Sequence, residues 1–471
     1  MNLIRFALPA ILLLFFAARS FRQRVFLLGI PFLMFMSDSV FFQNAQIFWV
    51  PGRFSPSTHL MIWLVIVWLL YFDLLLPVWR RSRPRAAPFG PALSPPEELV
   101  IAGIAGLAVL EVFLSWLRFG ELAQVIVQAK GFIYLFVGYF LLRAILCSAS
   151  RRDTLDFVKA LVVVNTAAAG LFILHQGLQL PIYEATEYQT VTFMGQRLTR
   201  SFYFMPPFLI LSLAYMFARR TWTVFWGGAM IVTLGALWVS YTRSLLIIAL
   251  VVLLLVLGVR LVKRAQAGLA IRRAVVILGI GVAFVGIAFT ALPVQSAYFA
   301  SRIGEATATG SLTGDANLQN RQEKLERVYD WLGPVGPWVG QGFGPPAQDP
   351  QAGEIRLMSS DLVWVPILYR LGLVGVLLVV LMYGMAALRA LRMTLSGDGD
   401  AEFLALVLLG VLVGTLLEGF VSWTFLNPAR YPMGLWVFAL LAAETWRRRA
   451  KAAPAGTELL PAPKEESRAV G

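Results

Sequence analysis

Arginine is the residue of this sequence whose type and position point most directly to chemistry. Its planar guanidinium binds phosphate oxygens in pairs and keeps its charge when partly desolvated. Arg243 lies in "VSYTRSLL", between two long apolar runs and without a basic neighbour. Arg197 and Arg200 lie in "RLTRSFYFMPP", before another apolar run, and Arg321 lies in "NRQEKLERVYDWLGPVGPWVGQGFG". Residues of this type could hold a diphosphate between them.

Carboxylates near the ends of apolar runs could supply a base. Asp361 opens the run "SDLVWVPILYRLGLVG", where a carboxylate can act as a general base, pair with an arginine, or stabilise the start of a helix. All three roles are open for Asp361. Glu111 and Glu418 are rival carboxylates within or at the edge of other runs, and Arg430 follows Glu418 across "LLEGFVSWTFLNPARYP".

The glycine-rich segment "GQGFG", which contains Gly340 and Gly342, invites comparison with nucleotide-binding loops. The dinucleotide fingerprint needs a strand before the glycines and a helix after them, whereas Pro345 and Pro346 follow here. We therefore expect a tight turn and no nucleotide. No metal site or other cofactor is expected either, because the histidines stand apart and there is one cysteine.

The elements that must position these residues are membrane-spanning helices. The chain has 471 residues, of which 58% are hydrophobic and 14% charged, and its apolar runs of about 16 to 22 residues suit helices rather than a barrel. The sequence predicts an all-α bundle of about 12 to 13 spans. The expected spans are 3–18, 25–40, 58–78, 98–117, 125–147, 157–178, 202–218, 222–240, 244–261, 274–293, 361–387, 402–420 and 431–446.

Positive charge alternates along the connections between these spans, which predicts their orientation. Every second connection is basic and should face the cytoplasm, and the net charge of +14 is explained by these connections rather than by nucleic-acid binding. We expect spans over 1–293, one long outer loop over 294–360 containing short helices, spans over 361–446 and a disordered cytoplasmic tail over 447–471. The basic connections hold Arg19, Arg22 and Arg24; Arg80, Arg81, Arg83 and Arg85; Arg151 and Arg152; Arg219 and Arg220; Arg260, Lys263, Arg264, Arg272 and Arg273; Arg389 and Arg392; and Arg447, Arg448, Arg449 and Lys451.

This orientation gives Arg243 a special position. It lies at the membrane boundary on the outer side, where the positive-inside rule disfavours a basic residue, so a functional role is favoured. Arg197, Arg200 and Arg430 have an alternative interpretation, since each could extend its guanidinium to lipid headgroups without binding a substrate.

Four segments together resemble the bacterial O-antigen ligase and polymerase superfamily of polytopic membrane glycosyltransferases. They are "RLTRSFYFMPPFLILSL", "YTRSLLIIALVVLLL", "NRQEKLERVYDWLGPVGPWVGQGFG" and "SDLVWVPILYRLGLVGVLL". They resemble, in order, an arginine segment ending in proline before a span, a Ser/Thr-Arg-Ser span start, an outer-loop pattern with paired glycines, and the following span with Gly-x-x-Gly. The resemblance covers roughly 190–390 and rests on the order of the segments.

The resemblance implies transfer or polymerisation of an undecaprenyl-diphosphate-linked oligosaccharide onto a glycan or lipid acceptor, outside the bacterial inner membrane, without metal or nucleotide. It implies that Arg197 or Arg200, with Arg243 and Arg321, binds the diphosphate. Arg243 would also act in catalysis by neutralising the leaving group. Supporting positions would be Glu418, Arg430, Gly340 and Gly342.

One difference between this sequence and the family pattern bears on the identity of the acceptor. Ligases of this family carry a histidine near the start of the span after the long loop, whereas this chain has Asp361 there. Asp361 as the base favours a polymerase over a lipid A-core ligase. A transporter or flippase, and a non-catalytic partner in envelope-glycan assembly, are the alternatives from other classes. The sequence shows no internal repeat of the kind that many transporters have, and it predicts no oligomeric state.

Overall fold

The computed structural model describes most of the chain from the fourth expected span onward. Residues 1–95 and 453–471 lie outside the described part, and so do the first three expected spans, most of 127–149 and most of 309–363. The described residues are 96–126, 129, 132, 139–140, 143, 146–147, 150–179, 190–199, 206–219, 223–241, 243–263, 267–308, 326, 330, 332, 336–343, 348–349, 353–354, 364–397, 399–419 and 431–452.

The described part is almost entirely helical, which confirms the all-α prediction. Its helices are α6 (Pro96–Phe119), α8 (Arg151–Leu178), α9 (Pro206–Ala218), α10 (Val224–Val239), α11 (Arg243–Val262), α12 (Ala267–Ala291), α13 (Pro293–Ala308), α15 (Gly336–Val339), α16 (Trp364–Ser396), α17 (Gly399–Gly419) and α18 (Tyr431–Ala452). Its strands are β1 (Thr190–Phe193), β2 (Gln196–Thr199), β3 (Gln348–Asp349) and β4 (Gly353–Glu354), which form two antiparallel hairpins. The sequence did not predict these hairpins.

Five described helices are long and apolar enough to cross a membrane, or six when the bent pair α12 and α13 counts as one. Three more of the 12 to 13 expected spans correspond to the shorter helices α9 and α10 and to α18. The remaining expected spans fall wholly or mostly on residues outside the described part. Several helices extend past the apolar run that predicted them. In α8, for example, the helix starts at Arg151, where the Ser150 side chain caps the backbone amide of Asp153.

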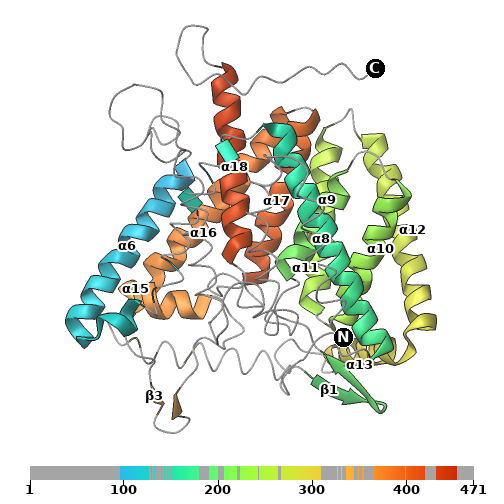
Figure 1. Cartoon of the computed structure of the whole chain (residues 1–471), viewed down its shortest axis with the longest axis horizontal. Helices are drawn as coiled ribbons and strands as arrows, with labels where there is room; N and C mark the ends of the chain where they lie inside the picture. Colours follow the sequence, from blue (N-terminus) through green and yellow to red (C-terminus); the bar gives the residue numbers. More distant parts are fainter. Residues whose placement is uncertain are drawn as a thin grey trace, which may run out of the picture.

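The core of the bundle is built around α17, the most buried of the candidate spans. It packs against α16, α9, α11 and α18 (Figure 1). Around this core, α6 packs on α16, and α8 and α10 pack on each other. The outward side of α6 carries exposed apolar residues, including Leu99, Val109 and Leu117, as expected for a helix in contact with lipid.

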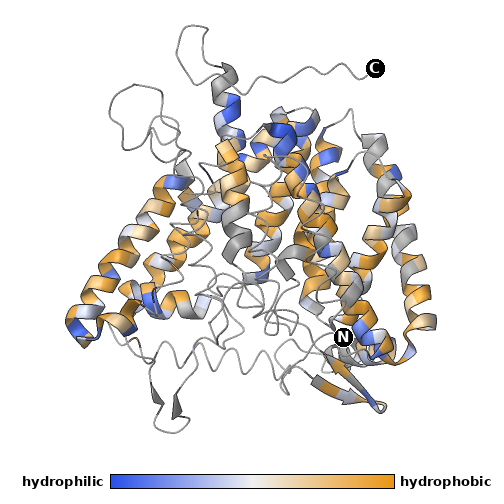
Figure 2. Cartoon of the chain, viewed as in Figure 1, coloured by the Kyte–Doolittle hydropathy of each residue, from blue (hydrophilic) through white to orange (hydrophobic). Residues whose placement is uncertain are grey.

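The ends of the bundle differ in composition. Figure 2 shows hydrophilic residues gathered where α8 begins and α16 and α18 end. We call this the basic end; it holds Arg151, Arg219, Lys263, Arg392 and Arg447. The opposite end, the loop end, carries both hairpins, α13 and α15 (Figure 1). The alternation of charge along the sequence predicted this separation.

Two helices at the loop end depart from straight geometry. α13 turns away from α12 by 112°, with the sharp change of direction just before Pro293. α16 contains a break at Gly372, whose φ of 64° and ψ of −168° are not helical. The first turns of α16 consequently lie across the loop end, while the rest of the helix runs through the bundle (Figure 1).

Candidate functional site

The turn Gly340–Phe343 is fastened onto the break in α16. The backbone amide of Gln341 donates a hydrogen bond to the carbonyl of Tyr369 at 2.7 Å, and that of Gly342 donates to the carbonyl of Arg370 at 3.1 Å. An unbroken helix would pair these carbonyls with amides four residues later. The break at Gly372 therefore frees two acceptors, which the turn uses. We call this arrangement the glycine clamp.

Three glycines are required for the clamp to close. Gly340, Gly342 and Gly372 have φ values of 79°, 75° and 64°, a region that side chains disfavour. A Cβ on Gly340 would lie 2.5 Å from the carbonyl carbon of Arg370, and one on Gly372 would collide with the carbonyl of Trp338. Both glycines of the predicted tight turn thus have positive φ, although the amides of Gln341 and Gly342 bond to α16 and do not close a turn within the segment.

One face of α6 supplies the polar wall of the clamp. Glu111, Ser115 and Arg118 are spaced by four and three residues and so share a face. The Ser115 hydroxyl accepts a hydrogen bond from the backbone amide of Phe343 at 2.7 Å, and Arg118 Nη1 donates to Gln341 Oε1 at 3.0 Å. The Glu111 side chain is buried, with Oε2 3.1 Å from where a Cβ on Gly342 would lie. A buried carboxylate in an apolar helix is a mark of function.

Phe343 anchors the end of the turn in the bundle. Its ring is fully buried and packs edge-on against Phe132, with 5.6 Å between centroids. The guanidinium of Arg370, which is itself buried, lies 5.7 Å from the centroid of the Phe343 ring. A cation over an aromatic face is stabilising and more so when desolvated. The turn is thus held by backbone, hydroxyl and aromatic contacts.

A second assembly at the loop end, the aromatic cluster, consists of Leu198, Tyr241, Tyr298 and Phe299. It joins β2, the turn before α11, and α13. Tyr241 and Tyr298 meet edge to face with centroids 4.9 Å apart. Beside the cluster, Gln295 of α13 donates to the carbonyl of Gln176 at 2.9 Å and to Gln196 Oε1 at 3.2 Å, which fastens the hairpin to α8.

Two of the predicted diphosphate-binding arginines border this cluster along the chain. Arg197 immediately precedes Leu198 in β2 and pairs with Thr192 across the hairpin. Arg243 is the first residue of α11, two positions after Tyr241. Because Leu198 and Tyr241 pack together, the backbones of the two arginines converge on the same cluster.

Tyr241 is a residue that the sequence analysis missed. Its backbone has a φ of 56°. A positive φ is unusual for a residue other than glycine and costs free energy that the surrounding structure must offset. The Tyr241 hydroxyl is buried and has no hydrogen-bond partner among the described residues. Burial and the neighbouring Tyr298 raise the pKa of Tyr241 well above its usual range, so the phenol stays neutral. The feature of the sequence that could have identified Tyr241 is its position directly before Thr242 and Arg243.

The remaining predicted site residues fall in different places. Glu418 is fully buried at the loop end of α17, next to Gly419, which packs against the ring of Trp364. Arg200, Arg321, Asp361 and Arg430 lie outside the described residues. Within the described part of the chain, no group of three or more His, Cys, Asp or Glu side chains could hold a metal ion.

The four segments on which the family resemblance rests are joined in pairs at the loop end. The arginine segment and the span start of Arg243 meet at the aromatic cluster. The glycine-containing loop and the following span meet at the glycine clamp. No protein-family model matches the chain, and no functionally curated protein matches it at a significant level of similarity.

Proposed function

We propose that this protein is a membrane glycosyltransferase of the O-antigen ligase and polymerase type. It would transfer an oligosaccharide from undecaprenyl diphosphate to a glycan or lipid acceptor. The observation that carries the proposal is the pairing of the four resembling segments, which are far apart in the sequence, at one end of the bundle. A function is argued from the residues of a site rather than from the fold, and the meeting of these segments at the same end of the bundle supports a common role.

The proposal includes an orientation in the bacterial inner membrane. The basic end would face the cytoplasm and the loop end the outer side, in accord with the positive-inside rule. A lipid-diphosphate donor would then reach the loop end from the outer leaflet, with its prenyl chain among the lipid-facing helices. The C-terminus, which follows the basic end of α18, would be cytoplasmic.

The chemistry we assign is displacement at the anomeric carbon. The hydroxyl of the acceptor attacks, Asp361 accepts its proton, and the bond between the anomeric carbon and the diphosphate oxygen breaks. The leaving undecaprenyl diphosphate gains negative charge, which Arg243, Arg321 and Arg197 or Arg200 would neutralise. No metal is needed in this scheme, because arginine supplies the positive charge.

The contacts that hold these elements in place support this scheme. A diphosphate clamp works only when its donors are positioned before the charge develops. The aromatic cluster fixes the backbone that leads into Arg243, and the glycine clamp fixes the end of the loop that carries Arg321. Glu418, which is buried at the same end, is a supporting residue in the proposal.

The decisive experiment is transfer by the purified protein in detergent. A defined undecaprenyl-diphosphate oligosaccharide is offered alone or with lipid A-core, and the products are separated on a gel. We expect a ladder from the donor alone, which identifies a polymerase; a single shift on lipid A-core would identify a ligase. No product from a donor that a known enzyme accepts would reject the proposal in favour of a transporter or an assembly partner.

A further inference from the structure

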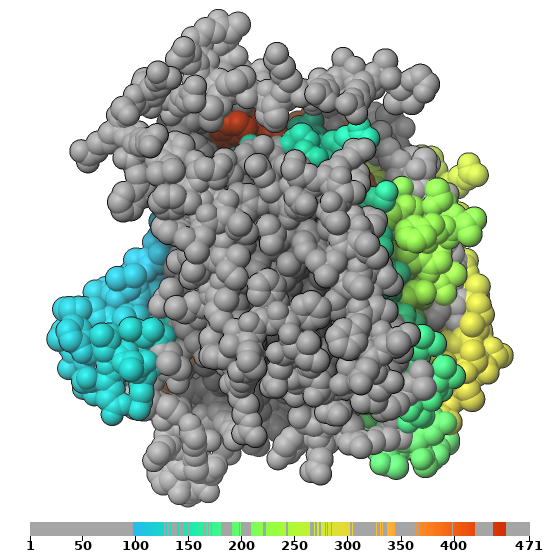
Figure 3. Space-filling view, viewed as in Figure 1, coloured from blue at the N-terminus to red at the C-terminus, as the bar shows by residue number. Residues whose placement is uncertain are grey.

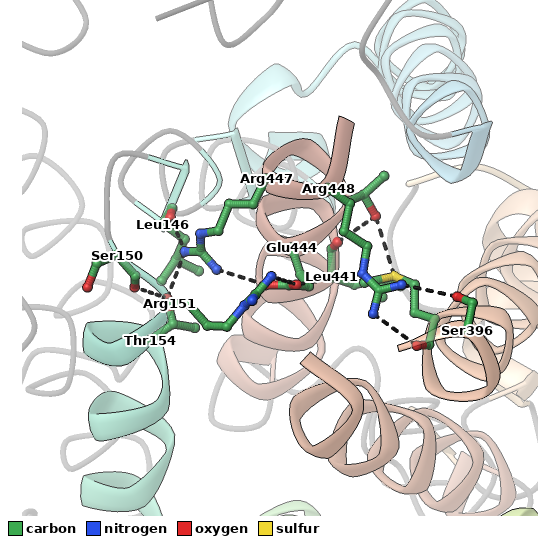
Figure 4. Close-up of polar contacts among 11 residues, drawn as sticks. Leu146, Ser150, Arg151, Thr154, Ser396, Leu441, Glu444, Arg447 and Arg448 are labelled. Atoms are coloured by element: carbon green, nitrogen blue, oxygen red, sulfur yellow. Dashed lines mark hydrogen bonds and ion pairs between the residues drawn. The ribbon is translucent and has the colours of Figure 1, made fainter. Parts of the chain in front are cut away.

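Glu111 of α6 is a buried carboxylate that has no hydrogen bond or ion pair with the described residues, and 7% of its surface remains accessible. A buried carboxylate without a partner costs free energy, so buried acidic residues are normally paired. Three other buried glutamates of the described part form ion pairs: Glu98 with Arg143, Glu402 with Lys263, and Glu444 with Arg151, the last of which is drawn in Figure 4. Glu111 differs from them.

Ser115, one turn along the same face of α6, also has unused hydrogen-bonding capacity. Its oxygen accepts a hydrogen bond from the amide of Phe343 at 2.7 Å, but a hydroxyl also carries a hydrogen that it can donate. Thr166 and Thr233 donate theirs to the carbonyl four residues earlier, each at 2.8 Å, which is a common arrangement in helices. Ser115 makes no such bond, and its hydroxyl donates to no acceptor among the described residues.

The side chains of Glu111 and Ser115 meet at Gly342 of the glycine clamp. A Cβ at this position would collide with Ser115 Oγ and lie 3.1 Å from Glu111 Oε2. Both oxygens therefore approach the same point, which a glycine leaves open. Figure 3 shows α6 reaching the surface at one edge of the molecule, so the two side chains lie near the periphery of the bundle. An acceptor without a donor and a donor without an acceptor are thus neighbours at the clamp.

The chemistry of these two groups indicates the class of ligand. The Glu111 carboxylate would repel an anion, and a metal ion would need more ligands, which no group of His, Cys, Asp or Glu side chains within the described part of the chain could supply. A hydroxyl fits, because it can donate to a carboxylate and accept from a serine at the same time. We propose that Glu111 and Ser115 bind a sugar hydroxyl of the oligosaccharide. The identity of this ligand rests on the proposed function, whereas the site itself lies on α6, outside the four segments of the family resemblance.

The test is the binding of two ligands by the full-length protein in detergent, measured by titration in native mass spectrometry. One ligand is an undecaprenyl-diphosphate oligosaccharide, and the other is undecaprenyl diphosphate, which lacks the sugar. Glu111→Ala should weaken binding of the first ligand about 10- to 100-fold, as expected for the loss of a hydrogen bond to a charged group. It should not weaken binding of the second ligand, because the bare carrier offers no sugar hydroxyl to Glu111.

Two further variants separate a contact with the ligand from a structural role. Glu111→Gln keeps the size of the side chain and should weaken binding of the oligosaccharide ligand about fivefold, since a neutral acceptor makes a weaker hydrogen bond than a charged one. It should not lower the unfolding temperature, because Glu111 has no partner among the described residues. Glu121→Gln removes the same charge from an exposed residue just beyond α6 and should bind both ligands as the wild type does.

Three results would overturn the site: unchanged affinity of the Glu111 variants for the oligosaccharide ligand, equal weakening for both ligands, or no binding of the oligosaccharide ligand by the wild type. The transfer assay gives a separate answer. A wild type that binds the oligosaccharide ligand without transferring it would reject the proposed function, and the comparison of the two ligands would still test Glu111.

Discussion

The backbone amide of Phe343 donates a hydrogen bond to the hydroxyl of Ser115, although the two residues are 228 positions apart. The bond joins the segment Gly340–Phe343 to the C-terminal part of α6, a helix that carries exposed apolar residues on its other side. A polar side chain in such a helix is expensive unless it is satisfied. Ser115 therefore specifies where the turn is held, and the glycine clamp is a specific contact rather than a chance approach of two segments.

Gly342→Ala should destabilise the protein through two separable effects. The new Cβ would collide with the Ser115 hydroxyl, and alanine disfavours the φ of 75° at this position. Ser115→Ala alone should cost about 1–3 kcal/mol, because it leaves the buried amide of Phe343 without its acceptor. The double variant should be less unstable than the sum of the two, since the collision disappears. Thermal unfolding in detergent measures the stability of the two single variants and the double variant. Strictly additive losses of stability would contradict the contact between Gly342 and Ser115.

Gly106→Ala provides the control for that series in the same helix. A Cβ at Gly106 meets nothing within 4 Å. Alanine should therefore stabilise α6 by roughly 0.5–1 kcal/mol through its better helix propensity.

Gly372→Ala should disrupt the break in α16. The added Cβ would collide with the carbonyl of Trp338, and the backbone angles at Gly372 are open to glycine alone among the common residues. We expect a large loss of stability together with loss of protection of the Gln341 and Gly342 amides in hydrogen exchange. Gly384→Ala, in the same helix and with open space around its Cβ, should be neutral or stabilising. Similar behaviour of the two variants would contradict the role of the break.

Tyr241→Phe separates packing from the hydroxyl. The ring packs against Tyr298, whereas the hydroxyl is buried without a partner among the described residues. Removing the oxygen should therefore leave the unfolding temperature unchanged or raise it. Tyr241→Ala should cost about 3–5 kcal/mol, as for other large-to-small changes of buried aromatic residues. If Tyr241→Phe lowers transferase activity without lowering stability, its hydroxyl acts on the substrate; a fall in stability would reveal a missing partner.

Arg243→Ala should strongly reduce polymer formation while the protein remains folded. The proposed role needs a positive charge at the start of α11, so Arg243→Lys should retain part of the activity but lose the paired hydrogen bonds to phosphate. By analogy with other electrostatic groups, the loss on Arg243→Ala should be about 100- to 1000-fold. The exposed Arg272 of α12 gives the control Arg272→Ala, which should keep full activity. Undiminished glycan chain length in Arg243→Ala would reject the assignment.

Asp361→Asn distinguishes the proposed base from the other carboxylates. The amide cannot accept the proton of the acceptor hydroxyl, so transfer should fall by about 100- to 10,000-fold with little change in donor binding. Glu418→Gln keeps the shape of a fully buried side chain and should have a smaller effect on rate. Rates are compared at saturating donor. A larger loss in Glu418→Gln than in Asp361→Asn would transfer the role of base to Glu418.

The sequence predicted the helices well because apolar runs and basic connections are local signals. The spans expected at 98–117, 244–261 and 402–420 correspond to α6, α11 and α17. The positive φ values of Gly340 and Gly342 were also predictable, since glycine is the residue that most readily adopts this conformation. Helix ends were less accurate, because a helix continues into polar sequence wherever other helices or a cap support it, as at Arg151.

The contacts of the site were not predictable in the same way. Ser115 and Arg118 lie in or beside an apolar run, and nothing local indicates that their partner is a turn in a distant part of the chain. The first hairpin was missed for a different reason. Its two turn residues, Met194 and Gly195, both have positive φ, at 48° and 75°. Methionine is an unusual choice for such a turn, in which Asn, Asp and Gly predominate.

The break at Gly372 also divides the length of α16 into unequal parts. The helix from Leu373 to Ser396 is about 36 Å long at roughly 1.5 Å per residue, which is enough to cross a hydrocarbon layer of about 30 Å. The turns before Gly372 are not needed for crossing. A change in bilayer thickness would alter the tilt of the crossing part, and the loop fastened to its end would shift with it. The position of the loop end relative to the bundle would therefore depend on the thickness of the membrane.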